Sequence, residues 1–262
     1  MRSALIGHSG FVGGTLQRQR QFDERFRSTD VHQLAGRSYD LLVCAGAPAQ
    51  KWLANRDPEA DRASLARLMD ALGAVRAARV VLVSTVDVFG APADVDEASP
   101  VDEQDLHPYG RHRRELERFV AERFAAHLIV RLPGLVGPGL RKNAVFDLHH
   151  ENQVAALDPR ARFQFYPTVN LWSDLAQALA LDLRLVHLSA APLGLAEVAR
   201  ECFGRELAPR HGGTPASYDV RSRHAAAFGG HDGYAYDQRA SLLAIRAYAQ
   251  SEPRRAPREA PA

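Results

Sequence analysis

A phenol and a guanidinium stand four residues apart, at Tyr109 and Arg113. On a helix this spacing places both side chains on one face. A neighbouring cation favours the charged form of a phenol and so lowers its pKa. The pair therefore indicates an acid or base that works near neutral pH. A surface tyrosine beside one of many arginines is the simpler interpretation of the pair taken alone.

Hydroxyl side chains end an apolar stretch of the chain at Ser84 and Thr85. At the end of a strand, the Thr85 hydroxyl can hydrogen-bond a substrate oxygen while a proton is transferred. Asp87 follows two residues later and lies on the same face of an extended chain, which makes it a candidate substrate contact. Residues of these types also cap turns and helices, and that alternative stays open.

Three glycines with the spacing G-x-x-G-x-x-G follow the first apolar run, at Gly7, Gly10 and Gly13. The pattern predicts a buried strand that turns sharply into a helix. The start of such a helix offers unpaired N–H groups and a partial positive charge, which suit a pyrophosphate. The candidate cofactor contacts in this stretch are Gly7, Ser9, Gly10, Phe11, Val12 and Gly13.

Apolar runs and amphipathic stretches alternate along the chain and predict the elements that must position these residues. The expected strands are Ser3–Ile6, Asp40–Cys44, Arg79–Ser84, His127–Leu132 and Leu185–Leu188, with a short polar edge strand at Glu24–Ser28. The expected helices are Phe11–Arg20, Ala60–Leu72, Gly110–Phe124, Ser173–Leu183, Leu195–Phe203 and Ser241–Ala249. This alternation is typical of an α/β fold with a Rossmann-like, doubly wound parallel sheet, which binds ligands at the carboxyl ends of its strands.

The composition is that of an ordinary globular protein, with 46% apolar and 24% charged residues and a net charge of +2. That balance gives no reason to expect nucleic acid or membrane binding. Nearly all basic residues are arginines, and Lys51 and Lys142 are the two lysines. Two cysteines, Cys44 and Cys202, indicate no disulfide framework and favour a reducing cytoplasm. No histidine pair has the spacing of a zinc site, so we expect no metal.

Taken together and in order, these stretches resemble the extended short-chain dehydrogenase/reductase family over roughly residues 1–185. That family includes sugar-nucleotide epimerases, dehydratases and dTDP-4-dehydrorhamnose reductase. The glycine stretch is similar to its phosphate loop, and Cys44-Ala45-Gly46 to the small-residue motif after its fourth strand. The stretch from Ser84 to Gly90 resembles its hydroxyl strand, and the stretch from Arg131 to Gly139 resembles the segment that leads into its substrate lobe.

The resemblance implies an NAD(P)-dependent oxidoreductase or epimerase that transfers a hydride to or from a sugar nucleotide or a similar carbonyl or hydroxyl substrate. Tyr109 matches the catalytic tyrosine and Thr85 the catalytic Ser/Thr. The family's Tyr-x-x-x-Lys is Tyr-x-x-x-Arg here, and Arg113 keeps the charge but cannot lose a proton. A non-catalytic NADP-binding sensor or assembly protein of the same fold is therefore the alternative.

The cofactor is expected to be NADP or NAD. Arg27 and Ser28, at the end of the edge strand, suit a ribose 2′-phosphate, whereas Asp30 suits a 2′-hydroxyl. We favour NADP slightly, because Arg27 and Ser28 fall nearer the expected strand end. The resemblance also implies cofactor contacts at Cys44, Ala45, Gly46, Tyr109 and Arg113.

Substrate contacts are predicted at Asp87, Arg141, Asn143 and Trp52. An acidic pair after the threonine would favour a dehydratase, and here Val86 replaces its first member, which argues against dehydration. The expected domains are an NAD(P)-binding domain over 1–190, with 140–168 contributing to the substrate lobe, a small substrate lobe over 191–250 and a disordered tail over 251–262. A homodimer is a further expectation.

Overall fold

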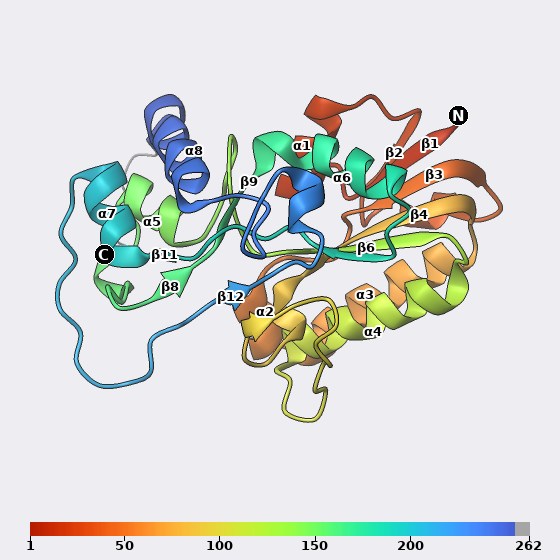
Figure 1. The fold of residues 1–262 in the computed structure, drawn as a ribbon. Helices are drawn as coiled ribbons and strands as arrows, with labels where there is room; N and C mark the ends of the chain where they lie inside the picture. The colour runs from red at the N-terminus through yellow and green to blue at the C-terminus, as the bar shows by residue number, and fades with distance from the viewer. Residues whose placement is uncertain (255–262) are drawn as a thin grey trace.

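A computed structural model describes residues 1–254 of the chain. Its centre is a parallel sheet of six strands in the order β10-β6-β4-β3-β1-β2 (Figure 1). The strands are β1 (Ser3–Ile6), β2 (Glu24–Phe26), β3 (Ser38–Cys44), β4 (Arg76–Thr85), β6 (His127–Leu132) and β10 (Leu185–His187). β1 pairs with β2 on one side and with β3 on the other. The strand order therefore reverses between β1 and β3, which is where such sheets bind ligands.

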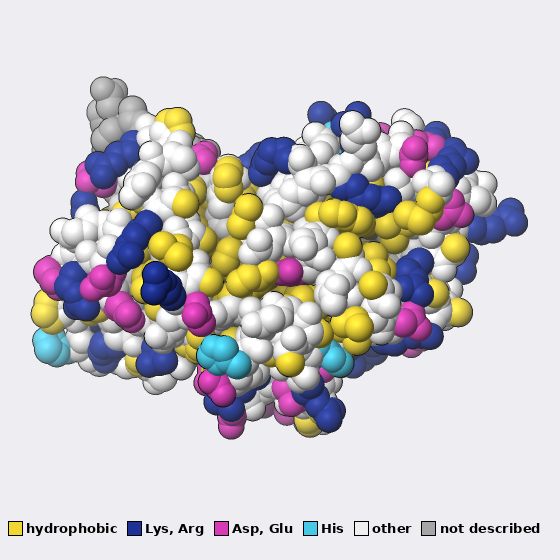
Figure 2. Space-filling model, turned by 45° about the horizontal axis from the view of Figure 1, so that its top comes forward, with side chains coloured by type: hydrophobic (Ala, Val, Ile, Leu, Met, Phe, Trp, Pro, Cys, Tyr) yellow, Lys and Arg dark blue, Asp and Glu magenta, His cyan; other side chains and the backbone are white. Residues whose placement is uncertain are grey.

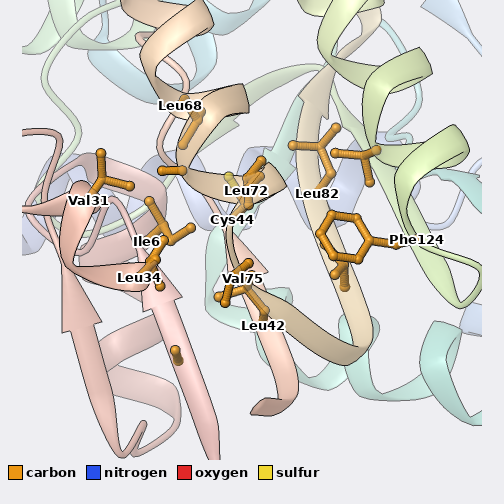
Figure 3. Close-up of a cluster of buried hydrophobic side chains, with 14 of the residues drawn as sticks. Ile6, Val31, Leu34, Leu42, Cys44, Leu68, Leu72, Val75, Leu82 and Phe124 are labelled. Carbon is orange, nitrogen blue, oxygen red and sulfur yellow. The ribbon is translucent and has the colours of Figure 1, made fainter. Parts of the chain in front are cut away.

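Helices cover both faces of this sheet. The helices α1 (Phe11–Gln19) and α6 (Leu171–Ala180) pack on one face, and α3 (Pro58–Gly73) and α4 (Pro108–Arg123) pack on the other. Figure 3 shows the second interface, where Leu68 and Leu72 of α3 lie over Cys44 and Leu82 of the sheet. The strands β1 and β6 and the later parts of β3 and β4 are covered on both faces, which explains why their sequences are largely apolar.

The predicted strands and helices are confirmed, with boundaries that differ by a few residues. Two short helices were missed, α2 (Lys51–Arg56) and α5 (Ala144–His150). Each spans fewer than eight residues, too few for a helical period to emerge from the sequence. Five short turns of 3-10 helix complete the described chain: η1 (Val31–Leu34), η2 (Val86–Val88), η3 (Val154–Ala156), η4 (Thr168–Asn170) and η5 (Ala225–Phe228).

A smaller lobe with its own apolar core lies to the left of the sheet in Figure 1. Its helices are α5, α7 (Leu195–Phe203) and α8 (Gln238–Ser251). Its short strands are β8 (Arg162–Phe163), which pairs with β11 (Leu193–Gly194), and β9 (Phe165–Pro167), which pairs with β7 (Gly134–Val136). The lobe therefore draws on residues from both sides of position 190.

The segment between α7 and α8 does not stay in this lobe. Within it, β12 (Asp219–Val220) pairs with β5 (Ala93–Val95), which follows the central strand β4. Glu97 fixes the segment by accepting hydrogen bonds from the Ser222 hydroxyl at 2.6 Å and the Arg223 N–H at 2.8 Å. The predicted lobe of 191–250 is therefore two structural parts, because its middle returns to the sheet.

The predicted tail begins as ordered chain. Glu252 accepts from the Gly139 N–H at 3.0 Å and, through its carbonyl, contacts a ring nitrogen of His149 at 2.8 Å. Residues 255–262, the rest of that prediction, lie outside the described residues.

The surface shows no large region of one charge on the face drawn in Figure 2, where basic and acidic side chains are interspersed. That distribution fits the prediction that the many arginines belong to solvated faces. None of the helices in residues 1–254 has the length and apolar character needed to cross a membrane.

Candidate active site

The turn after β1 contains glycines at positions where a side chain would overlap the backbone. Gly7 has a φ of +86°, and a Cβ there would lie 2.2 Å from the carbonyl oxygen of Ala45. A Cβ on Gly13 would lie 2.1 Å from the Gly7 oxygen, so the first turn of α1 packs directly on the loop. Gly10 caps α1 with no side-chain hydrogen bond. The N–H groups at the start of α1 are thus left without a side-chain cap at the switch point of the sheet.

Two further segments border this turn. The Gly7 N–H donates to Phe26 at the end of β2 at 2.7 Å, which places Arg27 directly beside the loop. The Ala45 N–H donates to Ile6 at 2.9 Å, so the loop after β3 runs alongside the glycines. Asp30 is engaged locally, because its carboxylate accepts from the Arg27 N–H at 2.5 Å.

The small-residue motif has a packing role as well as a place in the site. The Cys44 side chain is fully buried in the core, and burial raises its thiol pKa to about 11. A Cβ on Gly46 would lie 2.8 Å from the Ile6 side chain. Cofactor contacts from Cys44 to Gly46 are therefore open to the backbone and not to the cysteine thiol.

Tyr109 lies in the first turn of α4, beside the end of β4. A Cβ on Gly110 would lie 2.2 Å from the carbonyl oxygen of Asp87, so glycine is what lets α4 approach this strand end. The Tyr109 N–H donates to Asn55 Oδ1 at 3.0 Å, and the Thr85 hydroxyl lies near enough to the Tyr109 phenol to act on its pKa in the lowering direction. Two of the predicted catalytic residues are thus neighbours.

The pKa of Tyr109 differs from the sequence-based expectation. Burial raises it, because only 7% of the residue is exposed, and the nearby Arg113 charge opposes that rise without overcoming it. The sequence-based prediction of a lowered Tyr109 pKa took account of the Arg113 charge but not of the loss of water around the phenol. Tyr109 is therefore a protonated phenol at neutral pH in the cofactor-free chain.

Arg113 lies under the Tyr109 ring, with its guanidinium carbon 3.9 Å from the ring centroid. Its two terminal nitrogens donate to Asp61 of α3, one of them at 2.8 Å, and also to the carbonyl of Pro48. Burial alone would raise the pKa of Asp61, but the hydrogen bonds from Arg113 and His112 outweigh it and lower that pKa. Arg113 is thereby fixed between α3, α4 and the loop after β3.

We predict that Arg113→Lys lowers the free energy of unfolding by about 2–3 kcal/mol, because an ammonium cannot reproduce this forked contact with a buried carboxylate. Denaturant unfolding measures the loss. Arg62→Lys is the matched control: Arg62 also pairs α3 with α4, through Glu115 at 3.5 Å, but its side chain is 67% exposed. The control should change stability by less than about 0.5 kcal/mol. Equal losses in the two variants would contradict this account of Arg113.

Asp87 gathers three polar side chains at the end of β4. Lys51, the first residue of α2, donates from Nζ to Asp87 Oδ1 at 2.7 Å. The Tyr218 hydroxyl donates to the same oxygen at 2.9 Å. Thr85 donates to the other oxygen, Oδ2, at 3.5 Å. Asp87 therefore connects the catalytic candidate Thr85 to α2 and to the segment that returns from the small lobe.

Lys142 reaches the same region from the loop before α5. Its ammonium donates to the carbonyl of Ala49, next to the Pro48 carbonyl that holds Arg113. Burial, and then repulsion by Arg113, lower its pKa from 10.5 to about 8. Arg141, beside it, donates to the Ser9 carbonyl at 3.3 Å and so lies at the glycine turn.

The pKa of Lys142 has a consequence for stability. Between pH 8 and 10.5 the unfolded chain holds a proton on this lysine that the folded chain has released, so folding gains stability as the pH rises through that window. We expect denaturant unfolding of the wild type to show this rise and Lys142→Met to lack it. Lysine labelled with carbon-13 at Cε should give two signals, one of which titrates near pH 8. Two titrations near pH 10.5 would contradict the prediction.

Two predicted substrate residues, Asn143 and Trp52, make side-chain contacts with other parts of the protein. Asn143 caps α5: its Oδ1 accepts from the N–H groups of Val145 and Phe146, and its Nδ2 donates to Leu135 at 2.8 Å. Because its side-chain amide is engaged on both sides, we do not retain it in the proposed substrate site. Trp52 is 59% exposed and stacks with Arg56.

Four residues of the site were not predicted: Asn55, Asp61, His107 and Tyr218. His107 caps α4 through Nδ1, which accepts from the Gly110 N–H at 3.0 Å. Tyr218 comes from a glycine-rich stretch without periodicity, and its approach to Asp87 depends on the pairing of β12 with β5. The rarity of lysine was a usable signal, because Lys51 and Lys142 both reach this site.

In residues 1–254, no group of three or more His, Cys, Asp or Glu side chains is arranged to hold a metal.

One family of known proteins matches the sequence. The sequence model of the NAD dependent epimerase/dehydratase family matches residues 25–177, more than half of the chain. The match begins at β2, so the glycine turn lies just outside it. No protein of curated function matches the chain significantly in sequence.

Solved structures share the fold across nearly the whole chain. The dTDP-4-dehydrorhamnose reductase from Bacillus anthracis, in complex with NADP, is 16% identical, with 94% of this chain and 96% of that one covered and a TM-score of 0.73. A UDP-galactose 4-epimerase is 14% identical, with 95% and 98% covered and a TM-score of 0.70. MoeE5, in complex with UDP-glucose and NAD, is 17% identical, with 95% and 99% covered and a TM-score of 0.68.

Proposed function

The chain belongs to the NAD dependent epimerase/dehydratase family, and on that premise we propose that it is an NADP-dependent reductase of a carbonyl group on a sugar nucleotide. The observation that supports the proposal is that Thr85 and Tyr109 are neighbours at the strand edge that also holds the glycine turn. The loop after β3 links the two, because it contacts Gly7 at one end and Arg113 at Pro48.

The residues around the glycine turn fit a dinucleotide. A Cβ on Gly10 would find only the Gly7 oxygen nearby, at 3.3 Å, so the space above it is open to a diphosphate. The N–H groups at the start of α1 would bind that diphosphate. Arg27, at the end of β2, would bind a 2′-phosphate, while Asp30 is occupied by the Arg27 N–H. These features favour NADP over NAD.

The state of Tyr109 favours reduction. A phenol whose pKa is raised by burial keeps its proton and can donate it to a carbonyl oxygen, whereas oxidation of a hydroxyl would need the phenolate first. When bound, the reduced nicotinamide supplies a hydride to the carbonyl carbon. Thr85 holds the carbonyl oxygen, Tyr109 donates the proton to it, and Arg113 fixes the phenol ring from below.

The substrate class is inferred from two sources. Structures with the same fold carry sugar nucleotides or are named for acting on them. Asp87, which accepts hydrogen bonds from Lys51 and Tyr218, would offer its carboxylate to sugar hydroxyl groups. We place the sugar beside Asp87.

The proposal is tested by mixing the chain with NADPH and dTDP-4-dehydrorhamnose, or a panel of other keto-sugar nucleotides, and following the loss of reduced nicotinamide. We expect turnover with NADPH and slower turnover with NADH. Tight binding of NADPH without oxidation of the nicotinamide by any of these compounds would overturn the proposal and favour the non-catalytic alternative.

A further inference from the structure

Arg113 leaves Tyr109 without a proton donor at its own position. A guanidinium does not release a proton at accessible pH. Both terminal nitrogens of Arg113 are held by Asp61, Pro48 and the Tyr109 carbonyl. Once Tyr109 has given its proton to a substrate, its phenolate must be reprotonated from another direction. The 7% exposure of Tyr109 restricts direct access of water.

A row of neighbouring polar groups leads from Tyr109 to the surface. The Thr85 hydroxyl lies near the Tyr109 phenol, and it donates to Asp87 Oδ2 at 3.5 Å. Lys51 donates to Asp87 Oδ1 at 2.7 Å. The side chain of Asp87 is 18% exposed and that of Lys51 is 38% exposed, so the set passes from a buried phenol to a solvated amine.

The choice of residue type at position 51 is a second, independent observation. Of 33 basic residues, 31 are arginines and two are lysines, and Lys51 is one of these two. An arginine at position 51 would keep the charge and the ion pair with Asp87. A lysine differs in that its ammonium can release a proton and take another from water.

We propose that Lys51 supplies, through Asp87 and Thr85, the proton that returns Tyr109 to its acid form after each turnover. This inference rests on the proposed reductase function. Lys51 acts through other groups and contacts neither the substrate carbonyl nor the nicotinamide. Tyr218 holds the path in place, because its hydroxyl bonds both to Asp87 at 2.9 Å and to the Lys51 ammonium at 3.3 Å.

The proton balance is as follows. The Tyr109 O–H bond breaks as the substrate oxygen takes the proton, and the phenolate then takes the hydroxyl proton of Thr85. Lys51 protonates Asp87 at Oδ1, and the carboxyl group turns to return that proton to the Thr85 oxygen. Neutral Lys51 takes a proton from water, so one proton moves from solvent to Tyr109 and no electrons are transferred.

The test is Lys51→Arg, which keeps the charge and removes the transferable proton. The first turnover uses the proton already on Tyr109, so rapid mixing with NADPH and the keto-sugar nucleotide should show a wild-type first turnover. The steady-state rate should then fall about tenfold or more, because reprotonation of Tyr109 has become slow. The trace is a burst of one reduced nicotinamide oxidised per site, followed by the slow steady state. Asp87→Asn, which breaks the path at its middle, should show the same slow steady state.

Lys142→Arg is the matched control, since it makes the same exchange at the chain's other lysine. The Lys142 ammonium contacts Ala49 and takes no part in the bonds between Lys51 and Tyr109. We expect no burst, because any change in rate in this variant should appear equally in the first turnover and in the steady state. A burst in Lys142→Arg together with normal turnover in Lys51→Arg would overturn the proposal and assign the reprotonation of Tyr109 to Lys142.

Failure of this inference and failure of the proposed function give different results. If the wild type oxidises no NADPH with any keto-sugar nucleotide, the reductase function is wrong. If the wild type turns over and Lys51→Arg turns over equally well, the proton path is wrong.

Discussion

Tyr109→Phe is expected to lower kcat by about 10³-fold, because it removes the acid that protonates the substrate oxygen. The change deletes one hydroxyl, and the ring stays over Arg113. The affinity for NADPH should therefore stay within about twofold of wild type, since no binding interaction of comparable strength is lost. Steady-state turnover and calorimetric titration of the variant with NADPH separate the two effects.

Tyr39→Phe is the control for this prediction. Tyr39 is also buried, at 4% exposure, and its hydroxyl donates to Glu24 at 2.8 Å, at the far end of strand β3 from the site. We expect a loss of about 1 kcal/mol of stability and a wild-type kcat. If Tyr109→Phe retained full turnover, Tyr109 would not be the acid and the reaction would need another proton donor.

Gly10→Ala is expected to weaken NADPH binding by at least about tenfold, or about 1.4 kcal/mol, while the chain keeps its fold. A methyl group at Gly10 meets only the Gly7 oxygen, at 3.3 Å, and the residue has an ordinary φ of −76°. The methyl would instead occupy the space over the start of α1, where the diphosphate is proposed to lie. Calorimetric titration with NADPH measures the change.

Gly14→Ala, four residues along the same helix, is the matched control. A Cβ at Gly14 would make ordinary contacts, 3.6 Å from the His8 oxygen. An alanine inside a helix should raise stability by about 0.5–1 kcal/mol and leave NADPH binding unchanged. Equal affinity in the wild type and in Gly10→Ala would exclude the glycine turn as the diphosphate site.

The fold could be predicted because it depends on local patterns. The five apolar strands and the helices between them carry periodicities of their own, and Leu195–Phe203 matches the observed α7 at both ends. The short helices α2 and α5 lack such a period. The path of residues 204–237 was not predictable, because it depends on pairing between β12 and β5, which are more than a hundred residues apart in sequence.

The sequence indicated the parts of the site that lie within one short motif, as in the glycine turn and in Tyr109 with Arg113. It could not where contacts come from distant elements. Nothing around Asp61 in the sequence indicated that it would hold Arg113, and Tyr218 lies 131 residues from Asp87. The pKa of Tyr109 was predicted in the wrong direction, because the sequence revealed the neighbouring charge but not the depth of burial.

The measurement that tests the central claim most directly is a structure of the chain with NADPH bound. The account predicts that the diphosphate accepts hydrogen bonds from the N–H groups at the start of α1. It also predicts that the nicotinamide lies beside the Tyr109 hydroxyl. A dinucleotide bound elsewhere, or a nicotinamide out of reach of Tyr109, would contradict it.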